Sequence, residues 1–362
     1  MPCPCENESS SPNSPKTRNM TATSADPESG KGRARYRIDG CASTSQNDTA
    51  TTSLPPGMEL AVTVDTLVSG IHFPSDTAPV DIGYKALAVN ISDLAAMGAL
   101  PDWAVMSLTI PRWDECWMSE FQEGFHELAE QHGVRLMAWD VGAGPLAVTI
   151  QIHGQVPCGQ ALRRDAAHPG DLIFVTGTLG DAGLALAGRG FGTQGRGDGT
   201  PFRIPAEYLA FIEGRLARPT PRVTEGIALR GVAAAAIDIS DGLAADLDHI
   251  VQASSGRGGE KLGAVIDVEK LPLSPALRQI PDRVEAWRLA LSSGDDYELC
   301  FTLSPDRYRR LLRIARKFSC SITCLGRMET PPDAHSGVRF LGRGLASGEE
   351  LVSGGQGYRH FR

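Results

Sequence analysis

The sequence predicts an α/β (α+β) protein made of two mixed α/β domains. Two observations carry this prediction. Apolar, β-branched stretches typical of strands alternate with stretches whose apolar residues recur at helical spacing, and the alternation starts again near Pro157. The length of 362 residues fits two domains at roughly 100–200 residues each.

The N-terminal half begins with a strand followed by a helix. Glu59–Val68 is apolar and β-branched, which predicts the strand, and Val80–Gly98 carries apolar residues at helical spacing, which predicts the helix. The further elements expected here are a strand, a helix that ends at Gly133, and two strands around a glycine loop: Ala104–Ile110, Trp117–His132, Val134–Trp139 and Leu146–Val156.

The C-terminal half repeats the alternation. We expect strands at Asp171–Thr176, Ala233–Ile239, Ala264–Val268 and Tyr297–Leu303, helices at Gly177–Ala187 and Leu243–Gln252, and a flexible glycine-rich loop at Gly188–Thr200. Residues 1–35 are rich in Ser, Pro, Asn and Thr and predict a disordered extension. The predicted division is therefore 1–35 as extension, 36–157 as N-terminal domain and 158–362 as C-terminal domain.

Composition narrows the class of protein. Asp and Glu total 43 against 35 Lys and Arg, a formal net charge of -8, which argues against nonspecific binding to nucleic acid or to an anionic membrane, although a local basic patch is compatible with it. The eight cysteines are scattered without a paired framework, and no uncharged apolar run reaches the ~20 residues that span a bilayer. We therefore expect a soluble cytoplasmic protein with reduced thiols.

Four aspartates draw attention as candidate ligands. Asp65, Asp140 and Asp238 each follow an apolar strand and precede a turn-like segment, and Asp93 is the only charged residue between Ala86 and Pro101. Any single Asp at such a place more commonly caps a helix or begins a turn. Taken together, carboxylates without partnering Cys or His favour Mg²⁺, which usually arrives with phosphates.

The segment Asp238-Ile-Ser-Asp241-Gly is the most informative of these. Two carboxylates bracket a strand-to-helix turn, and Ser240 is placed to cap the following helix. Capping explains one acid but not both, which favours a metal and phosphate role. The glycines of Gly177–Gly183 are a weaker phosphate-loop candidate, because their spacing matches neither dinucleotide-binding nor P-loop patterns. The chain also lacks the protein-kinase and hydrolase signatures.

Seven segments, taken in order, resemble the thiamine-monophosphate kinase family, which belongs with aminoimidazole ribonucleotide synthetase and selenophosphate synthetase. Together they extend from about Asp48 to the end of the chain. The segments are DTLVSGIHF (65–73), GYKALAVNISDLAAMGA (83–99), LRR (162–164), VTGTLGDA (175–182), DISDGL (238–243), GDDYEL (294–299) and GYRHF (357–361).

The resemblance implies a fold, an activity and a set of site residues. It implies an N-terminal domain that dimerises through its strands, a second α/β domain, and ATP-dependent, Mg²⁺-dependent phosphorylation of thiamine monophosphate by direct in-line transfer, in a homodimer. Carried over by position, it assigns magnesium to Asp48, Asp65, Asp93, Asp140, Asp238 and Asp241. It assigns catalysis to Asp65, Asp93, Asp140 and Asp238, ATP to Asp140, Arg164 and Ser240, and thiamine phosphate to His72, Glu298 and Tyr358.

This chain departs from the family pattern at three places. Asn47 stands where the family has the first of two acids, Trp139 stands where it has a glycine before Asp140, and Val64 stands where it has a threonine before Asp65. Two alternative functions therefore stay open: another ATP-using enzyme of the superfamily, such as one like aminoimidazole ribonucleotide synthetase, or a catalytically impaired paralogue that binds nucleotide.

Overall fold

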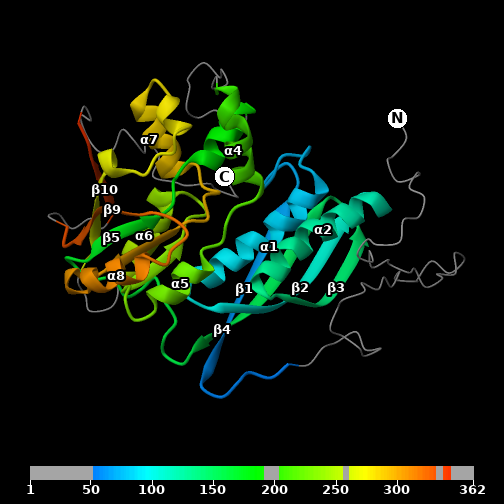
Figure 1. Ribbon diagram of the computed structural model, residues 1–362, viewed down its shortest axis with the longest axis horizontal. Coiled ribbons are helices and arrows are strands. Elements are labelled where there is room, and N and C mark those ends of the chain that lie inside the picture. Colours follow the sequence, from blue (N-terminus) through cyan, green and yellow to red (C-terminus); the bar gives the residue numbers. More distant parts are fainter. Residues whose placement is uncertain (1–51, 191–203, 256–260, 332–336, 344–362) are drawn as a thin grey trace, which may run out of the picture.

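The computed structural model of the chain describes residues 52–190, 204–255, 261–331 and 337–343 (Figure 1). The predicted extension at 1–35, most of the predicted loop at 188–200, Asp48 and Tyr358 lie outside these residues. No helix in the described ranges combines the length and the apolar character that a membrane span needs.

A four-stranded sheet carries the N-terminal half. Its order is β1-β4-β2-β3, with β1–β4 and β4–β2 antiparallel and β2–β3 parallel. Two helices pack on one face of it (Figure 1). The elements are β1 (Met58–Val68), α1 (Pro79–Ala96), β2 (Leu100–Ile110), α2 (Glu115–His132), β3 (Arg135–Ala143) and β4 (Ala147–Pro157).

Local chemistry sets the limits of the two helices. Helix α1 begins with Pro79, at a position where a backbone N–H would have no acceptor within the helix, so the missing N–H of proline costs no hydrogen bond. The Asp114 side chain caps α2 by accepting from the Trp117 amide at 3.0 Å, and Gly133 ends it in the left-handed conformation. Glycine also lets the helices touch, since a Cβ at Gly124 would lie 1.7 Å from the Val80 carbonyl oxygen.

The two faces of this sheet differ. Ile150 and Met106 lie on the face that α1 and α2 cover, and both are buried in the core. The opposite face carries Leu60, Val62 and Val64 of β1, each about half exposed at 49%, 48% and 57%. A strand normally alternates apolar and polar side chains when one face meets water. The sheet therefore has an open face that is apolar along β1, where no described part of the chain fully covers these three side chains.

A six-stranded sheet carries the C-terminal half, in the order β10-β7-β9-β5-β8-β6. Neighbouring strands are antiparallel except for the parallel pair β10–β7. Its strands are β5 (Leu172–Thr176), β6 (Ala235–Asp238), β7 (Gly263–Asp267), β8 (Leu299–Leu303), β9 (Ile322–Glu329) and β10 (Val338–Leu341).

Helices cover both faces of this second sheet. On β5, Ile173 and Val175 point into a core shared with α6 and α7, whereas Phe174 points into one shared with α5 and α8. The helices of this half are α3 (Asp181–Gly188), α4 (Ala206–Ala217), α5 (Val223–Leu229), α6 (Leu243–Ser254), α7 (Arg283–Ser292) and α8 (Tyr308–Ala315), with short 3₁₀ turns at Val268–Lys270, Leu277–Gln279 and Pro305–Arg307.

The mixed α/β fold class and every strand and helix named from the sequence are confirmed, with shifted ends. The helix expected at Gly177–Ala187 begins only at Asp181, because Gly177 and Gly180 have positive φ. The sequence reasoning did not anticipate α4, α5, α7, α8, β9 and β10. The division at residue 157 stays a prediction; it falls where β4 ends, between the strands of the two sheets.

Candidate active site

Helix α1 brings carboxylates of the two halves together. Asp93 near its C-terminal end accepts a hydrogen bond from the Thr63 hydroxyl of β1 at 2.5 Å. Its neighbour Ser92 donates to the carboxylate of Asp238, at the end of β6, at 2.6 Å. Asp65, on the same face of β1 as Thr63, completes the group. We call Asp65, Asp93 and Asp238 the carboxylate cluster.

The carboxylate cluster concentrates negative charge out of water. Burial, and then the charge of Asp93, raise the pKa of Asp238 well above its ordinary value and that of Asp65 to about 6. Burial also raises the pKa of Asp93, against hydrogen bonds from Thr63 and Asp238 and the charge of Arg164. Carboxylates that repel one another in this way share protons or bind a cation. Their hard oxygen atoms are ligands that Mg²⁺ prefers, so the chemistry of these donors suits magnesium.

The loop after Asp238 is organised by a residue that sequence reasoning missed. One oxygen of Asp246, inside α6, accepts from the backbone amides of Ser240, Asp241 and Gly242 at 3.0, 3.0 and 3.1 Å. The expectation that Ser240 caps α6 is wrong, because Gly242 is the N-cap residue and its helix end has no side-chain cap. Burial and the charge of Asp241 raise the pKa of Asp246 to about 7.

Asp241 also belongs to a group with metal-binding atoms. Ligand atoms of Asp241, Asp246 and His249 all lie within 4.8 Å of one another, and within the described residues no other group meets that condition. Asp241 was predicted as a ligand, whereas Asp246 and His249 were not. A signal was present in the sequence, because Asp246 and His249 lie one helical turn apart on α6.

Asp140 lies apart from the carboxylate cluster. In the register of the first sheet, Asp65 shares a face with Ile150, Met106 and Trp139, whereas Asp140 shares the opposite face with Ser107 and Thr149. Three strand spacings of about 4.8 Å also separate β1 from β3. The Asp140 side chain is exposed, on the same open face as Val62 and Val64.

Trp139 occupies the helix-covered face instead. It packs, half-buried, against the first core together with Trp117 of α2. The indole and the Asp140 carboxylate thus point to opposite sides of the sheet, as successive strand residues do. The substitution of glycine by Trp139 therefore fills space beneath α2 without covering the face that carries Asp140.

The residues predicted to contact thiamine phosphate are placed differently from one another. His72 lies in the loop between β1 and α1, where its Nδ1 accepts from the Val68 amide at 2.9 Å. Glu298 is only 1% exposed. Its carboxylate accepts two hydrogen bonds from Arg222 at 2.6 Å, one from Arg215 at 3.0 Å and one from the Thr176 hydroxyl at 2.6 Å. All of these partners belong to the second half.

The glycine loop before α3 packs on buried carboxylates. The Gly180 amide donates to both oxygens of Asp296, at 2.8 and 3.0 Å. A Cβ at Gly177 would lie 2.1 Å from an oxygen of Glu298. The Gly180 amide is thus already engaged by a protein carboxylate, and the phosphate-loop interpretation of this segment loses its main support.

Asp295 belongs to the same GDDYEL segment as Asp296 and Glu298 but is less buried than either. Its side chain is 21% exposed and pairs with the buried Lys85 ammonium of α1 at 3.0 Å. Sequence reasoning missed both residues. Lys85 carried a signal, because it is the only basic residue of α1.

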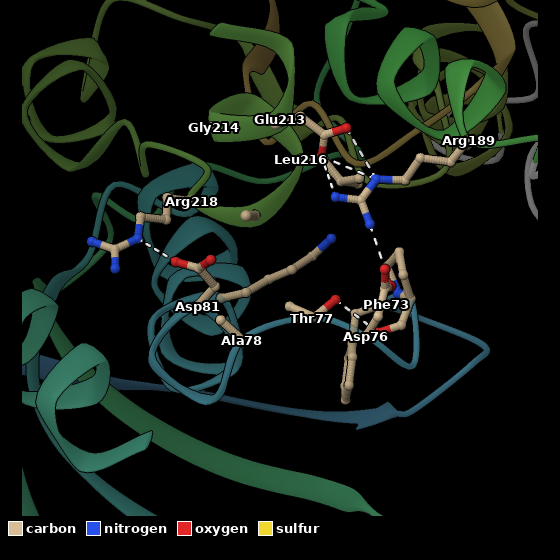
Figure 2. Close-up of a pocket in the computed structure, with 13 residues that line it drawn as sticks. Phe73, Asp76, Thr77, Ala78, Asp81, Arg189, Glu213, Gly214, Leu216 and Arg218 are labelled. Carbon is tan, nitrogen blue, oxygen red and sulfur yellow. Dashed lines mark hydrogen bonds and ion pairs between the residues drawn. The ribbon is translucent and has the colours of Figure 1, made fainter. Parts of the chain in front are cut away.

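A cleft of about 390 Å³ lies between the loop after β1, the start of α1, and helices α3 and α4. Figure 2 shows two arginines across it: Arg189 contacts Glu213 and Asp76, and Arg218 contacts Asp81. Lys85 also lines this cleft, and Phe73 follows His72 directly. The cleft therefore joins the two halves beside the predicted substrate residue His72.

Comparison with known proteins gives consistent results. Residues 46–156 match the family described as "AIR synthase related protein, N-terminal domain". The thiamine-monophosphate kinase of Salmonella typhimurium is 43% identical over 318 residues, which cover 87% of this chain and 90% of the relative. That of Haemophilus influenzae is 37% identical, with the same coverage of both chains.

Solved structures agree with these relatives. The crystal structure of thiamine-monophosphate kinase from Stenotrophomonas maltophilia K279a is 43% identical, with a TM-score of 0.73 over 83% of this chain and 91% of that chain. AaThiL complexed with AMPPCP and TMP is 28% identical, with a TM-score of 0.68 over 87% of this chain and 91% of that chain. Both the sequence and the arrangement of elements are thus shared along most of the chain.

Proposed function

The chain belongs to the thiamine-monophosphate kinase family, and we propose that its carboxylate cluster supports the phosphorylation of thiamine monophosphate by ATP. The observation that carries this proposal is the meeting of Asp65, Asp93 and Asp238 near the C-terminal end of α1, the helix whose N-terminal half lines the cleft between the two halves. The product is thiamine diphosphate. The alternative of an enzyme like aminoimidazole ribonucleotide synthetase is disfavoured by the names and coverage of the relatives.

The metal in this proposal is Mg²⁺, held by the carboxylate cluster together with Asp241 and the predicted ligand Asp48. When bound, the cation neutralises charge on the phosphates that approach one another. The chain's own contribution is orientation. The Thr63 and Ser92 hydroxyls fix the carboxylates of Asp93 and Asp238, and the amides bound by Asp246 fix the loop that carries Ser240 and Asp241.

No strong general base is needed for this reaction. The acceptor is already an anionic phosphate oxygen, so positioning and charge neutralisation supply most of the rate enhancement. We assign ATP to Arg164 and Ser240, and thiamine phosphate to His72 and Tyr358. Glu298 was predicted to contact thiamine phosphate, but Arg222, Arg215 and Thr176 enclose it. We therefore propose that Asp295 faces the substrate in place of Glu298.

We further propose a homodimer in which Asp140 acts on the partner's site. The open face of the first sheet carries the exposed apolar side chains of Leu60, Val62 and Val64, and burying them favours association with a second copy. Asp140 lies on that same face, away from its own carboxylate cluster. A second copy docked there supplies the Asp140 that this site lacks.

The test of activity is an endpoint assay with purified protein, ATP, Mg²⁺ and thiamine phosphate. We expect equal formation of thiamine diphosphate and ADP, lost on omission of Mg²⁺. Asp93→Asn should lower kcat by at least about 100-fold through loss of charge at the phosphates. Asp267→Asn, at an exposed turn, is the matched control and should retain activity. Absence of both products from the wild-type protein would favour the catalytically impaired paralogue.

The shared-site proposal has its own test. Inactive Asp93→Asn and Asp140→Asn proteins are mixed, dissociated and reassociated. Random pairing should restore about a quarter of wild-type activity, because half the dimers are mixed and each has one intact site. Recovery would be absent if Asp140 served its own subunit.

We also infer a cytoplasmic location. The described cysteines Cys158, Cys300, Cys320 and Cys324 are free thiols. Free thiols are typical of a reducing compartment.

A further inference from the structure

Lys85 is a buried charge that the proposed reaction does not yet use. Its side chain on α1 is only 2% exposed, and its ammonium lies 3.0 Å from Asp295 Oδ2. Lysine is seldom buried to this degree unless it is paired, because removing an ammonium from water is costly. The position therefore calls for an explanation beyond helix formation.

The partner of Lys85 sits in a strained stretch of backbone. Asp295 and Tyr297 have φ values of 60° and 50° and are the only non-glycine residues with positive φ in the described ranges. Two backbone hydrogen bonds hold this stretch, from the Asp295 amide to the Ser240 carbonyl at 2.9 Å and from the Tyr297 amide to the Ile239 carbonyl at 2.8 Å. Strain of this kind persists where the surroundings enforce it, and it gathers at functional sites.

Both oxygens of Asp295 are fixed. Oδ2 pairs with Lys85, and Oδ1 accepts from the Tyr297 hydroxyl at 3.1 Å. The Asp295 side chain nevertheless stays 21% exposed. A carboxylate that is held in one orientation and still meets solvent is prepared to accept a further hydrogen bond, because each oxygen has two lone-pair sites.

This trio lies between the carboxylate cluster and the cleft. The Tyr297 amide donates to the carbonyl of Ile239 at 2.8 Å, and Ile239 directly follows Asp238, so this segment lies beside that cluster. On the other side, Lys85 lines the cleft whose labelled walls in Figure 2 include Asp81 and Arg218. A substrate that reached from the cleft to the carboxylate cluster would pass these residues.

We propose that Lys85 is a positioning residue for the acceptor substrate, acting through Asp295. The ammonium fixes the Asp295 carboxylate so that it accepts from a donor on the non-phosphate part of thiamine phosphate, such as its amino group. This inference rests on the proposed function, because it concerns the acceptor of that reaction. It adds a residue from the first half of the chain to a substrate contact provided by the second.

The test compares Lys85→Met and Lys85→Arg with the control Lys270→Met. The side chain of Lys270 is 57% exposed, and its ammonium pairs with Asp267 at the surface. We expect Lys85→Met to raise KM for thiamine phosphate at least tenfold while KM for ATP changes less than twofold. Lys85→Arg should recover part of that loss, and Lys270→Met should match the wild-type protein. Unfolding curves establish that each variant is folded.

A double-mutant cycle with Asp295→Asn separates positioning from a structural role. If Lys85 acts through Asp295, the loss caused by Lys85→Met should shrink at least threefold in the Asp295→Asn background. Equal rises in both KM values, or independent losses from the two substitutions, would overturn the proposal. A wild-type protein without kinase activity would instead refute the proposed function, and direct binding of thiamine phosphate would then test the same variants.

Discussion

A substitution at Glu298 distinguishes two roles of this residue. The sequence predicts that Glu298 contacts the substrate, whereas the structure buries its carboxylate among protein side chains. The Glu298→Gln substitution keeps the size of the side chain and one acceptor oxygen but removes its charge. Arg222 and Arg215 would then lose the anion that their guanidinium groups now contact at 2.6 and 3.0 Å. If the role of Glu298 is structural, the protein should lose stability first and substrate affinity only slightly.

The magnitude follows from the burial of all three groups. Glu298 is 1% exposed, and the side chains of Arg222 and Arg215 are 10% and 13% exposed. Removing one partner of a buried ion pair costs about 3–5 kcal/mol, because a charge stays buried without compensation. The four short hydrogen bonds to this carboxylate support the upper part of that range. A surface ion pair of the same chemistry is worth about 1 kcal/mol or less.

The assay combines urea unfolding with steady-state kinetics. Glu298→Gln should lower the free energy of unfolding by about 3–5 kcal/mol while the folded fraction keeps its KM for thiamine phosphate within about threefold. Glu329→Gln is the control, since Glu329 pairs with the exposed Arg339 on the surface. A stability change below about 1 kcal/mol together with a tenfold rise in that KM would refute the structural role and restore the predicted substrate contact.

Two further predictions concern pH and packing. The pKa of Asp246 in the folded protein is about 7, above the ordinary value of 3.8, so the folded state holds this proton more tightly than the unfolded state. In EDTA, the free energy of unfolding of the wild-type protein should therefore fall by up to about 4 kcal/mol as pH rises from 4 to 8. Asp246→Asn keeps an acceptor oxygen for the three amides but cannot ionise, so its free energy of unfolding should change much less with pH, as measured by urea unfolding at several pH values. The same pH dependence in the variant and the wild-type protein would contradict this prediction. Gly124→Ala should cost more than about 2 kcal/mol in thermal unfolding, because the added methyl meets the Val80 carbonyl, whereas Gly214→Ala on α4 meets no atom within 4 Å and should be tolerated.

The sequence allowed good predictions where the pattern is local. Helix α2 was predicted at Trp117–His132 with its end at Gly133, and the structure confirms the helix and that end. The predicted start was two residues late, because the capping Asp114 was not recognised. Strand β1 is marked by its β-branched residues. The missed helix α8 shows the opposite case. This helix has only eight residues, three of them arginines, and Leu311 is the only one that is buried, so the short segment gives few apolar positions from which to predict a helix.

The sequence showed which residues belong to the candidate site more readily than it showed where each side chain lies. Asp65, Asp93 and Asp238 meet as the sequence suggested, because strand ends and a polar helix position gather at one place. The face on which Asp140 lies depends on the register of β2 with β3, and one step along a strand reverses it. The burial of Glu298 depends on arginines far away in the sequence. Such contacts carry no local signal.

Helix α1 explains why the site depends on both halves. Asp81, Lys85 and Ser92 lie within about 40° of one another around its axis. Each contacts a different element of the second half: Arg218 at 2.5 Å, Asp295 at 3.0 Å and Asp238 at 2.6 Å.

The same helix carries Asp93, which Thr63 ties to β1. Asp65 and Asp93 thus move with the first sheet, whereas Asp238 belongs to the second. A cation held between Asp93 and Asp238 would bind the docked halves more tightly than the separated halves, and by linkage it would stabilise their docking. Lys85 and Asp295 supply a second link along the same helix face. The alignment of the acceptor and the closure of the metal site therefore depend on one shared element, and a shift of α1 against the second sheet would disturb both.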